Sequence, residues 1–450
     1  MANSNQVSIS PDQVKLNYGF SPTTETLNVT NKLLQRNHDD LHIFFRDLNG
    51  HNHIAHNLLT RLALGASPSE LQTAFDDDLP TQRGMPQLHD HVVQKLKDES
   101  FFLEMMKDGS QYANFLAFFE QEINNKGWRE VVNEYVFSRS KIANTLLPLM
   151  YDGAYHAIIH LGLGVEFQLP SIIAEALAQA AAHQSFDTDW FFYRGEELAL
   201  GREEPTTTSL LDLAGKIADN DAICRAGRTV GPIGTMKQKL CIYPQVGEDL
   251  LSIVSQWRVN EDSLEHKIAE MISFCSLMAG AAQRPGKATK IDFFFMHCVT
   301  SSFFFTIFAT QPWVSTEAKI RLVEWKGRMD LLWYATCGVP HLEINEIRNY
   351  SGHPSESMDW EALIRAVNEQ HDDGHVAKFV RALLRGAEVA RRITEGRPHT
   401  PAPISISLKG EDWLRLARMS YDTTLDLSGP AKWVLMAGID KAWDEVPDQA

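Results

Sequence analysis

The sequence predicts a mainly α-helical fold, formed as a single large domain with a metal site between helices. Apolar residues recur every three or four positions through most of the chain, and strand-like alternation is confined to short runs. The 450 residues are 44% hydrophobic and 22% charged, an ordinary composition for a globular protein with a large buried core. Residues 1–450 contain no internal repeat and no confident linker, so one helical domain is expected, with two helical lobes as the alternative.

The clearest predicted helix spans Ile54 to Ala63, where apolar residues recur at helical spacing up to a break at Gly65. A second helix is expected to begin with Ser67 as N-cap, Pro68 in the first turn and Glu70 closing a capping box. The same periodicity predicts further helices at Phe101–Phe119, Ile172–Ala182, Leu264–Ala282, Lys319–Thr336, Ala377–Ile393 and Ala431–Trp443.

Charge and cysteine content narrow the class of protein. The formal net charge of −16 argues against a general nucleic-acid binder, which would usually carry a basic surface. The five cysteines are odd in number and form no Cys-x-x-Cys pair, which argues against a disulfide framework or a zinc ribbon. The first ten residues are polar, and the longest apolar runs are too short for the roughly 20 residues that a membrane span needs. We therefore expect a cytoplasmic protein without a membrane partner, while its oligomeric state is not predicted.

The 17 histidines carry the most informative pattern, because several of them fall into four groups. These groups are His51, His53 and His56; His156 and His160; His297; and His371, His375 and Lys378. Spacings of three or four residues place side chains on one helix face, one turn apart. Many of the neighbours are apolar, so the imidazoles are expected to be buried, and a buried imidazole needs partners for both nitrogens.

Helical bundles build metal sites from such inward-facing side chains, and imidazole is a common ligand for zinc, iron, copper and nickel. The alternative is a set of core histidines satisfied by ordinary hydrogen bonds, and spacing alone leaves both interpretations open. The remaining histidines have weaker contexts and are expected to be surface or structural residues: His38, His42, His89, His91, His183, His266, His341, His353 and His399.

Lys378 is the unusual member of the fourth group. An ammonium one turn from a ligand histidine would repel a cation, but burial lowers the pKa of a lysine readily. A neutral amine could react with carbon dioxide to give a carbamate, which binds metal as a carboxylate does. The sequence fits equally well a solvent-facing basic stripe formed by Lys378, Arg381 and Arg385.

Four segments between about residues 50 and 390 resemble the successive motif blocks of the questin oxidase-like family of fungal secondary metabolism. They read HNHIAHNLLTRLALGASPSEL, HAIIHLGLGVEF, KIDFFFMHCVTSS and DDGHVAKFVRALL. The resemblance implies a helical fold and the oxidative opening of a polyketide-derived anthraquinone, as in the conversion of questin to a benzophenone. It also implies one of two chemistries: an NADPH-dependent Baeyer–Villiger-type oxidation, or dioxygen chemistry at a non-haem iron held by histidines and a carbamylated lysine. Ala157 departs from the family, which often has proline there.

Carried over by motif, the resemblance implies five metal ligands: His56, His160, His297, His375 and Lys378. His53 and His156 belong to the same motifs and could replace or support their neighbours. Thr300, one turn after His297, is expected to hydrogen-bond an anionic ligand such as the Lys378 carbamate; the alternative is a helix-interior threonine bonded to a preceding carbonyl. Glu166 is expected to orient an imidazole from six residues after His160.

The sequence favours metal chemistry over a flavin or nicotinamide enzyme. A dinucleotide site needs a Gly-x-Gly-x-x-Gly turn, but Gly162-Leu-Gly164 lacks the third glycine and the Gly227–Gly234 segment has the wrong spacing. We therefore predict an Fe(II)-dependent oxygenase, specifically a dioxygenase, with dioxygen as co-substrate and NADPH retained only as a possible reductant. Aromatic side chains could line a pocket for the planar substrate or simply pack in the core: Trp190, Phe191, Phe192, Phe294, Phe295, Phe303, Phe304, Phe305 and Trp313. A metal-dependent hydrolase and a metal-free helical scaffold are the alternatives from other classes.

Overall fold

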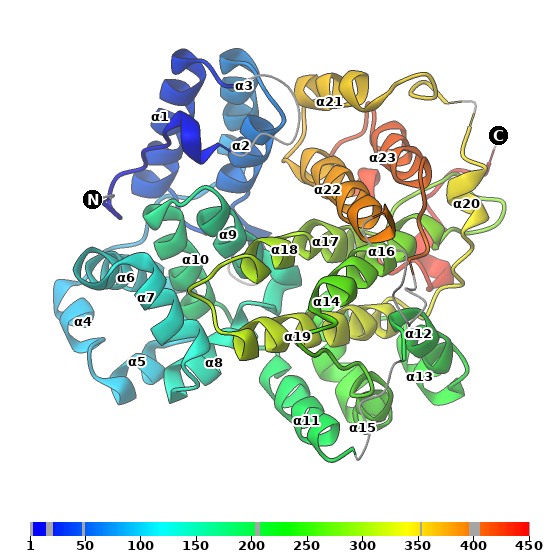
Figure 1. Ribbon diagram of the computed structural model, residues 1–450, viewed down its shortest axis with the longest axis horizontal. Helices are drawn as coiled ribbons and strands as arrows, with labels where there is room; N and C mark the ends of the chain where they lie inside the picture. The colour runs from blue at the N-terminus through cyan, green and yellow to red at the C-terminus, as the bar shows by residue number, and fades with distance from the viewer. Residues whose placement is uncertain are drawn as a thin grey trace. The chain divides into compact units, whose positions relative to one another are not determined.

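The computed structural model describes residues 3–14, 21–46, 50–202, 208–351, 353–395 and 406–449, and it is mainly helical, as predicted (Figure 1). The strands of the described residues, β1 (Phe44–Arg46) and β2 (Gly50–His51), form one antiparallel pair. The chain divides into two compact units. The first comprises Met1–Asp189, Thr310–Val314 and Ile364–Lys378, and the second comprises the remaining segments up to Ala450. The single domain spanning residues 1–450 stays a prediction.

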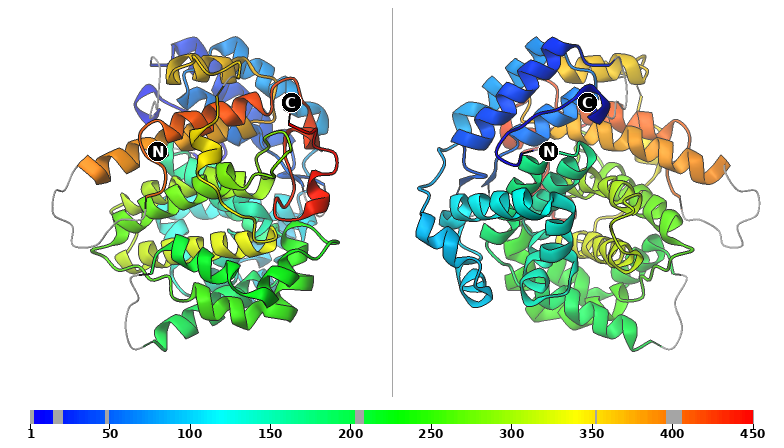
Figure 2. Two further views of the ribbon diagram at one scale, coloured as in Figure 1. Left: turned by 90° about the vertical axis from the view of Figure 1, so that its right-hand side faces the viewer. Right: turned by 60° about the vertical axis from the view of Figure 1, so that its left-hand side comes forward.

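The first unit contains the helices that precede residue 189 and short segments from later in the chain. Its helices are η1 (Pro11–Gln13), α1 (Thr24–Asp40), α2 (Ile54–Ala63), α3 (Pro68–Asp78), η2 (Leu79–Thr81), α4 (Asp90–Lys95), α5 (Glu99–Met105), η3 (Gly109–Gln111), α6 (Tyr112–Lys126), α7 (Trp128–Val132), η4 (Asn133–Phe137), α8 (Lys141–Leu149), α9 (Asp152–Glu166) and α10 (Pro170–Ala182). In both views of Figure 2, α1, α2 and α3 lie side by side, in agreement with their contacts.

The core of the first unit is built around α2 and α10, in which every residue is buried. A helix that is apolar on all sides is suited only to an interior position, and α10 packs against both α6 and α9. The α9–α10 approach depends on Gly164, since a Cβ atom there would lie 2.7 Å from Ile173. Because α2, α9 and α10 lie in this core, the polar side chains that they carry are buried as well.

Arg61 ties α2 to the late segment of the same unit. Its guanidinium donates to the carbonyls of Val367 and Gln370, at 3.1 and 2.8 Å, and also to that of Asn368. Asn57, one turn earlier, accepts from Arg61 Nε at 2.8 Å. These charge-assisted bonds satisfy carbonyls at and just beyond the end of α21 (Trp360–Glu369), and so anchor the chain that leads into α22 (His375–Glu395).

The second unit contains the middle and the C-terminal part of the chain. Its helices, some of which begin in or cross from the first unit, are α11 (Thr188–Leu200), α12 (Leu210–Ala218), α13 (Asp221–Gly227), α14 (Gly234–Lys237), η5 (Gln238–Ile242), α15 (Tyr243–Val254), α16 (Leu264–Ala281), α17 (Phe293–Ser302), α18 (Phe304–Ala309), α19 (Thr316–Thr336), α20 (Asn345–Arg348), α21, α22, α23 (Asp412–Asp422), η6 (Gly429–Lys432) and η7 (Asp440–Trp443).

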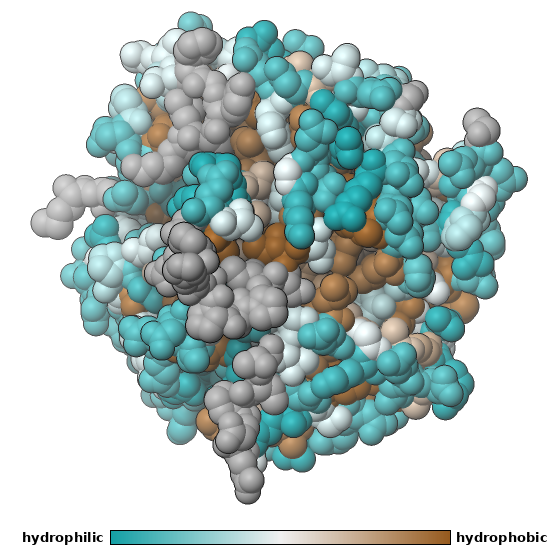
Figure 3. Space-filling view, turned by 45° about the vertical axis from the view of Figure 1, so that its right-hand side comes forward, coloured by the Kyte–Doolittle hydropathy of each residue, from teal (hydrophilic) through white to brown (hydrophobic). Residues whose placement is uncertain are grey.

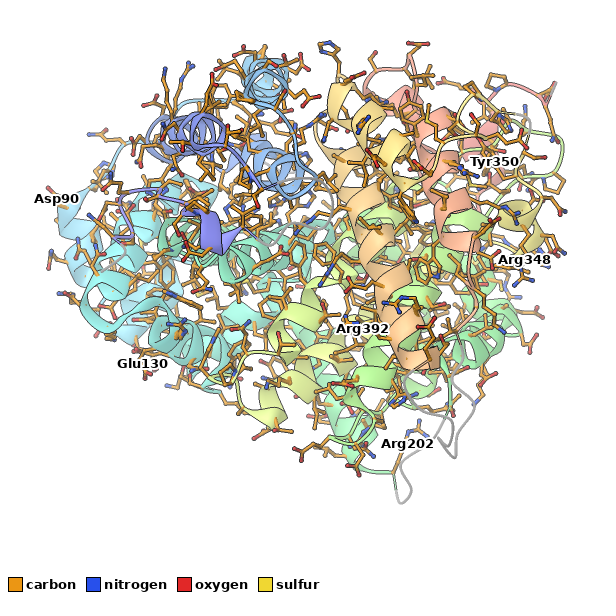
Figure 4. All side chains as sticks on the ribbon, turned by 45° about the horizontal axis from the view of Figure 1, so that its top comes forward. Asp90, Glu130, Arg202, Arg348, Tyr350 and Arg392 are labelled. Atoms are coloured by element: carbon orange, nitrogen blue, oxygen red, sulfur yellow. The ribbon has the colours of Figure 1, made fainter. Side chains whose placement is uncertain are left out.

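In the second unit, α16 packs against α17 and α19. A fully buried ion pair between Lys326 and Asp330 lies in this core, with Cys275 Sγ 3.1 Å from the Asp330 carboxylate. Arg348 and Tyr350 are labelled in Figure 4. Arg348, the last residue of α20, contacts Asp412 of α23 at 3.4 Å, and the hydroxyl of Tyr350, just after α20, donates to a carboxylate oxygen of Asp422 of α23 at 3.1 Å.

Two helix predictions were wrong in detail. The segment Phe101–Phe119 is interrupted after α5, where Lys107 adopts a positive φ of 70° and Asp108 caps the next turn. The segment Ala431–Trp443 forms only short 3-10 turns at its ends. Between these turns, Ala437 N donates to an Asp292 carboxylate oxygen at 2.7 Å, so tertiary hydrogen bonds replace helical ones.

Hydrophilic side chains cover most of the face shown in Figure 3, with hydrophobic residues exposed between them. Among the described residues, no helix combines the length and the apolar character that crossing a membrane requires. All five cysteines are buried and free of disulfides.

Candidate metal centre

His53, His156 and His375 converge in the interior of the first unit. His53 immediately precedes α2, His156 lies on α9, and His375 is the first residue of α22. One ring nitrogen of each lies within 4.8 Å of the others, and all three residues are buried. Three imidazoles at this separation are a suitable donor set for a transition metal.

The imidazoles also face one another in pairs. His53 Nε2 lies 2.7 Å from His156 Nε2, and His56 Nε2 lies 3.1 Å from His160 Nδ1. A further pair joins His51 Nε2 and His183 Nε2 at 3.1 Å. Two nitrogens at right angles on a metal, each about 2.1 Å from it, would lie about 3.0 Å apart. The pair distances therefore fit either a hydrogen bond or two lone pairs directed at a shared cation.

Unusual backbone geometry precedes His156. Gly153, Ala154 and Tyr155 adopt φ values of 59°, 55° and 68°, and the Gly153 carbonyl contacts His156 Nδ1. Left-handed geometry costs a non-glycine residue roughly 1–2 kcal/mol. A Cβ atom on Gly153 would lie 2.4 Å from His183 Nε2. Strain of this kind persists where the surroundings enforce it, and here it places a ring nitrogen of His156 within the cluster.

The approach to His375 also depends on a glycine. Gly374 has a φ of +84°, and a Cβ atom there would lie 2.7 Å from the Asn57 side chain. Asp372, which precedes α22, accepts from Val376 N in its first turn at 2.8 Å. His375 Nδ1 contacts an Asp373 carboxylate oxygen at 2.7 Å, which leaves Nε2 as the nitrogen available to a metal.

Electrostatics keep His51, His53 and His56 in the neutral form that binds metals. Burial lowers the pKa of His53 well below its usual value, and the nearby charges of Lys378 and the other histidines lower it further. Burial and the Lys378 charge also lower the pKa of His56. For His51, burial and the charge of His156 are the leading causes of a lowered pKa. At neutral pH these rings are uncharged and can act as ligands.

Lys378 is buried with 4% of its surface exposed, which excludes the solvent-facing basic stripe. Arg381 is buried too, with its guanidinium 5.0 Å from the centre of the Phe303 ring. Burial lowers the pKa of Lys378 to about 8, against the raising effect of the acidic residues Asp373, Asp372 and Asp78. None of the described residues accepts a hydrogen bond from Lys378 Nζ. Burying an amine costs free energy unless another group forms a polar interaction with it.

A second set of contacts leads away from His160. Its Nε2 lies 2.8 Å from Glu175 Oε2, and Glu175 Oε1 lies 2.7 Å from His38 Nδ1. His38 Nε2 in turn lies 2.8 Å from Glu120 Oε1. Burial lowers the pKa of His38, but hydrogen bonds to Glu120 and Glu175 outweigh it and raise this pKa to about 10. Burial would raise the pKa of Glu175, yet its bonds to His160 and His38 lower it to about 2.

The charged His38 predicts a specific pH dependence of stability. Its pKa is about 10 in the folded state and 6.5 in the reference state, so its stabilisation is full below pH 6.5 and is lost as the pH rises through 10. Glu120 and Glu175 face the ring, and Tyr112, whose pKa is raised by burial and by these two charges, stays neutral. Replacing His38 by glutamine should therefore cost a few kcal/mol at pH 6, a difference that shrinks by up to about 1.4 kcal/mol per pH unit towards pH 9.5.

Urea unfolding of the wild type and the His38→Gln variant at several pH values measures this difference directly. A difference in the free energy of unfolding that stays constant from pH 6 to pH 9.5 would contradict a protonated His38.

The predicted site residues are divided between the two units of the chain. His56, His160, His375 and Lys378 all belong to the first unit, where the predicted pairs His156–His160 and His375–Lys378 each share one helix. His371 lies before α22, is largely exposed and contacts Asp77 at 2.8 Å, so its expected pairing with His375 on one helix face was wrong.

His297 and Thr300 lie on α17 in the second unit. His297 Nδ1 contacts the Phe293 carbonyl at 2.7 Å, and the Thr300 hydroxyl donates to the His297 carbonyl at 3.3 Å, the contact expected of a helix-interior threonine. Glu166 is buried at the end of α9. The metal roles of these three residues stay predictions.

Most of the aromatic residues considered for the substrate pocket pack in the core. Phe294 stacks on Trp333 with ring centres 4.7 Å apart, and Phe192 stacks on Trp325 at 4.2 Å. Phe303 and Phe304 contact each other at 4.0 Å. Trp190 is 38% exposed. Core packing therefore accounts for much of this aromatic content.

Sequence reasoning missed Glu175 and Asp373 as partners of the histidines, and it treated His38 and His183 as surface or structural residues. The sequence does contain a signal for Glu175. This carboxylate lies in an otherwise apolar, alanine-rich helix, and a carboxylate cannot be buried there without a partner. No local pattern reveals that this partner is a histidine 137 positions earlier.

The fold and the site thus define a helical protein with a buried histidine cluster suited to a metal ion. Residues 50–383 match the model of the questin oxidase-like family. The chain is 55% identical over 430 residues to a Baeyer–Villiger oxidase of Pestalotiopsis microspora, with 94% of each chain covered. It is 54% identical to a Baeyer–Villiger oxidase of Emericella nidulans, with 96% of each chain covered. A questin oxidase of Aspergillus fumigatus is 40% identical over 99% of this chain and 100% of its own length. The chain belongs to the questin oxidase-like family.

Proposed function

We propose that this protein is an iron-dependent oxygenase that opens the ring of an anthraquinone such as questin. The observation that carries this proposal is the convergence of His53, His156 and His375 beside a buried Lys378. The substrate class comes from relatives named questin oxidase, and their oxidase names favour oxidation over hydrolysis.

The residues present fit a metal ion. None of the described residues hydrogen-bonds the buried Lys378 Nζ, so this amine has a polar requirement that a carbamate bound to a metal would meet. The predicted ligands are His56, His160, His297, His375 and a carbamate on Lys378, with His53 and His156 able to replace or support them. When bound, ferrous iron would supply the site at which dioxygen is activated, provided that one position stays open.

The protein's own residues would set the environment of that chemistry. Burial keeps His51, His53 and His56 neutral and excludes bulk water from the cluster. Asp373 and the Gly153 carbonyl hold the outward-facing nitrogens of His375 and His156, so the remaining nitrogens are oriented before a metal arrives. Thr300 is proposed to support an anionic ligand.

A Baeyer–Villiger-type oxidation, with oxygen inserted beside a ring carbonyl, is the second candidate, favoured by the names of several relatives. Incubating the purified protein with questin in air and without oxygen, with and without NADPH, separates the candidates. We expect ring opening that requires both dioxygen and bound iron, with NADPH needed only as a source of the electrons that the product requires besides dioxygen. Turnover that requires NADPH but not iron would favour the second candidate, and unchanged turnover after complete removal of iron would contradict the proposed iron dependence.

A further inference from the structure

Glu175 lies at the centre of a buried hydrogen-bonded chain that starts at the histidine cluster. It is 1% exposed and uses one carboxylate oxygen for each of two imidazoles: Oε2 for His160 and Oε1 for His38. The chain continues through His38 to Glu120, whose side chain is 13% exposed. Every link is 2.7–2.8 Å long, the length expected of charge-assisted hydrogen bonds.

This arrangement determines which nitrogen of His160 carries the proton. An ionised carboxylate only accepts hydrogen bonds, so His160 must donate from Nε2 to Glu175. In a neutral imidazole, Nδ1 then holds the lone pair. That nitrogen is the one facing His56, at 3.1 Å. The same carboxylate therefore orients the ring and directs its lone pair towards the histidine cluster.

His38 holds the carboxylate in place. It lies between Glu175 and Glu120 and contacts one of them with each ring nitrogen. An imidazolium in this position donates to both carboxylates and offsets the cost of burying Glu175. Without His38, Glu175 would lose one of its two hydrogen bonds and could turn away from His160.

We propose that Glu175 is a positioning residue of the metal centre, which fixes His160 with Nε2 protonated and Nδ1 available as a ligand, with His38 and Glu120 holding the carboxylate in place. The inference rests on the proposed metal-dependent function and adds to it the group that prepares His160. Carboxylate–histidine–metal arrangements recur in proteins because the carboxylate fixes the tautomer and raises the basicity of the ligand.

The Glu175→Gln variant tests this role with almost no change of shape. A glutamine side chain has one acceptor and one donor group, so it cannot accept from His160 and His38 at once, and one ring must change its tautomer or turn. We expect the affinity for Co(II), used as a spectroscopic probe and measured by competition with a chelator, to fall about 10- to 100-fold. The visible absorption of bound Co(II) should also shift, which a purely structural role of Glu175 would not cause.

Glu122→Gln is the matched control. Glu122 is a buried carboxylate on α6 of the same unit, and it bonds Tyr135 and Lys126 instead of a histidine. This variant should keep the wild-type affinity for Co(II). Glu175→Asp, which keeps both acceptor oxygens on a shorter side chain, should bind Co(II) more tightly than Glu175→Gln. It also provides the test if the glutamine variant does not fold.

The outcomes separate this inference from the proposed function. Wild-type protein that binds no metal would overturn both. Wild-type protein that binds Co(II), with equal affinity and spectrum in Glu175→Gln, would overturn the positioning role alone. If only the aspartate variant folds, a wild-type affinity and spectrum in that variant would likewise overturn it, since the shorter side chain cannot keep both contacts unchanged.

Discussion

Replacing His375 by alanine is expected to remove most of the iron from the purified protein. His375 contributes one of three ring nitrogens within 4.8 Å of one another, and Asp373 already orients its ring. Losing a residue that only supports a ligand costs about 10- to 100-fold in metal affinity, so losing a ligand should cost at least about 100-fold. The same result is predicted for His297→Ala, and for both variants it should appear as lost iron and lost activity together.

His371→Ala is the control for His375→Ala. It removes an exposed histidine four residues earlier that contacts Asp77. Elemental analysis of the variants, alongside thermal unfolding to confirm that each is folded, measures the effect. A folded His375→Ala protein with its full complement of iron would remove His375 from the ligand set, and the same result for His297→Ala would remove His297.

The second large effect is expected at Lys378. A lysine carbamate forms when the neutral amine takes up carbon dioxide and releases a proton, which converts a cation repelled by a metal into an anionic ligand. Lys378 is buried near histidines, and none of the described residues accepts a hydrogen bond from its amine. The Lys378→Met variant keeps the length of the side chain without its nitrogen. We therefore expect its affinity for iron to fall by at least about 100-fold. Lys378→Glu should recover part of the binding through its carboxylate.

Arg385→Met is the matched control, because Arg385 is a basic residue on the same helix that pairs with Glu388. This variant should retain iron. After loading with carbon-13 dioxide, an NMR signal from a carbamate carbon bonded to Lys378 Nζ would identify the modification. Full iron occupancy in a folded Lys378→Met protein would contradict it and would leave a site made of histidines.

Local periodicity predicted much of the helical architecture. The predicted capping box at Ser67 is confirmed, with the side chains of Ser67 and Glu70 bonded to each other's backbone. It was predictable because this signal depends on only four neighbouring residues. The prediction for Ala431–Trp443 was wrong, because that segment is held by Asp292 and by a close approach of Gly438 to Gly338. Such contacts join residues about 100 or more positions apart, and periodicity does not report them.

The candidate site was predictable only in part for a similar reason. Helical spacing grouped His156 with His160 and His375 with Lys378, and each pair shares one helix of the structure. The facing pairs join residues about 100 positions apart, as in His53 with His156 and His56 with His160. Two of the residues in the left-handed backbone before His156, Ala154 and Tyr155, are not glycine. Their residue types therefore did not predict this turn.

The most direct test of the metal centre is the iron content of the wild-type protein, purified without chelators and compared with its activity on an anthraquinone. The account predicts about one iron per chain, with activity that is lost when a chelator removes the iron and is restored when ferrous iron is added back. A folded, metal-free protein that opens the anthraquinone ring at an undiminished rate would contradict it.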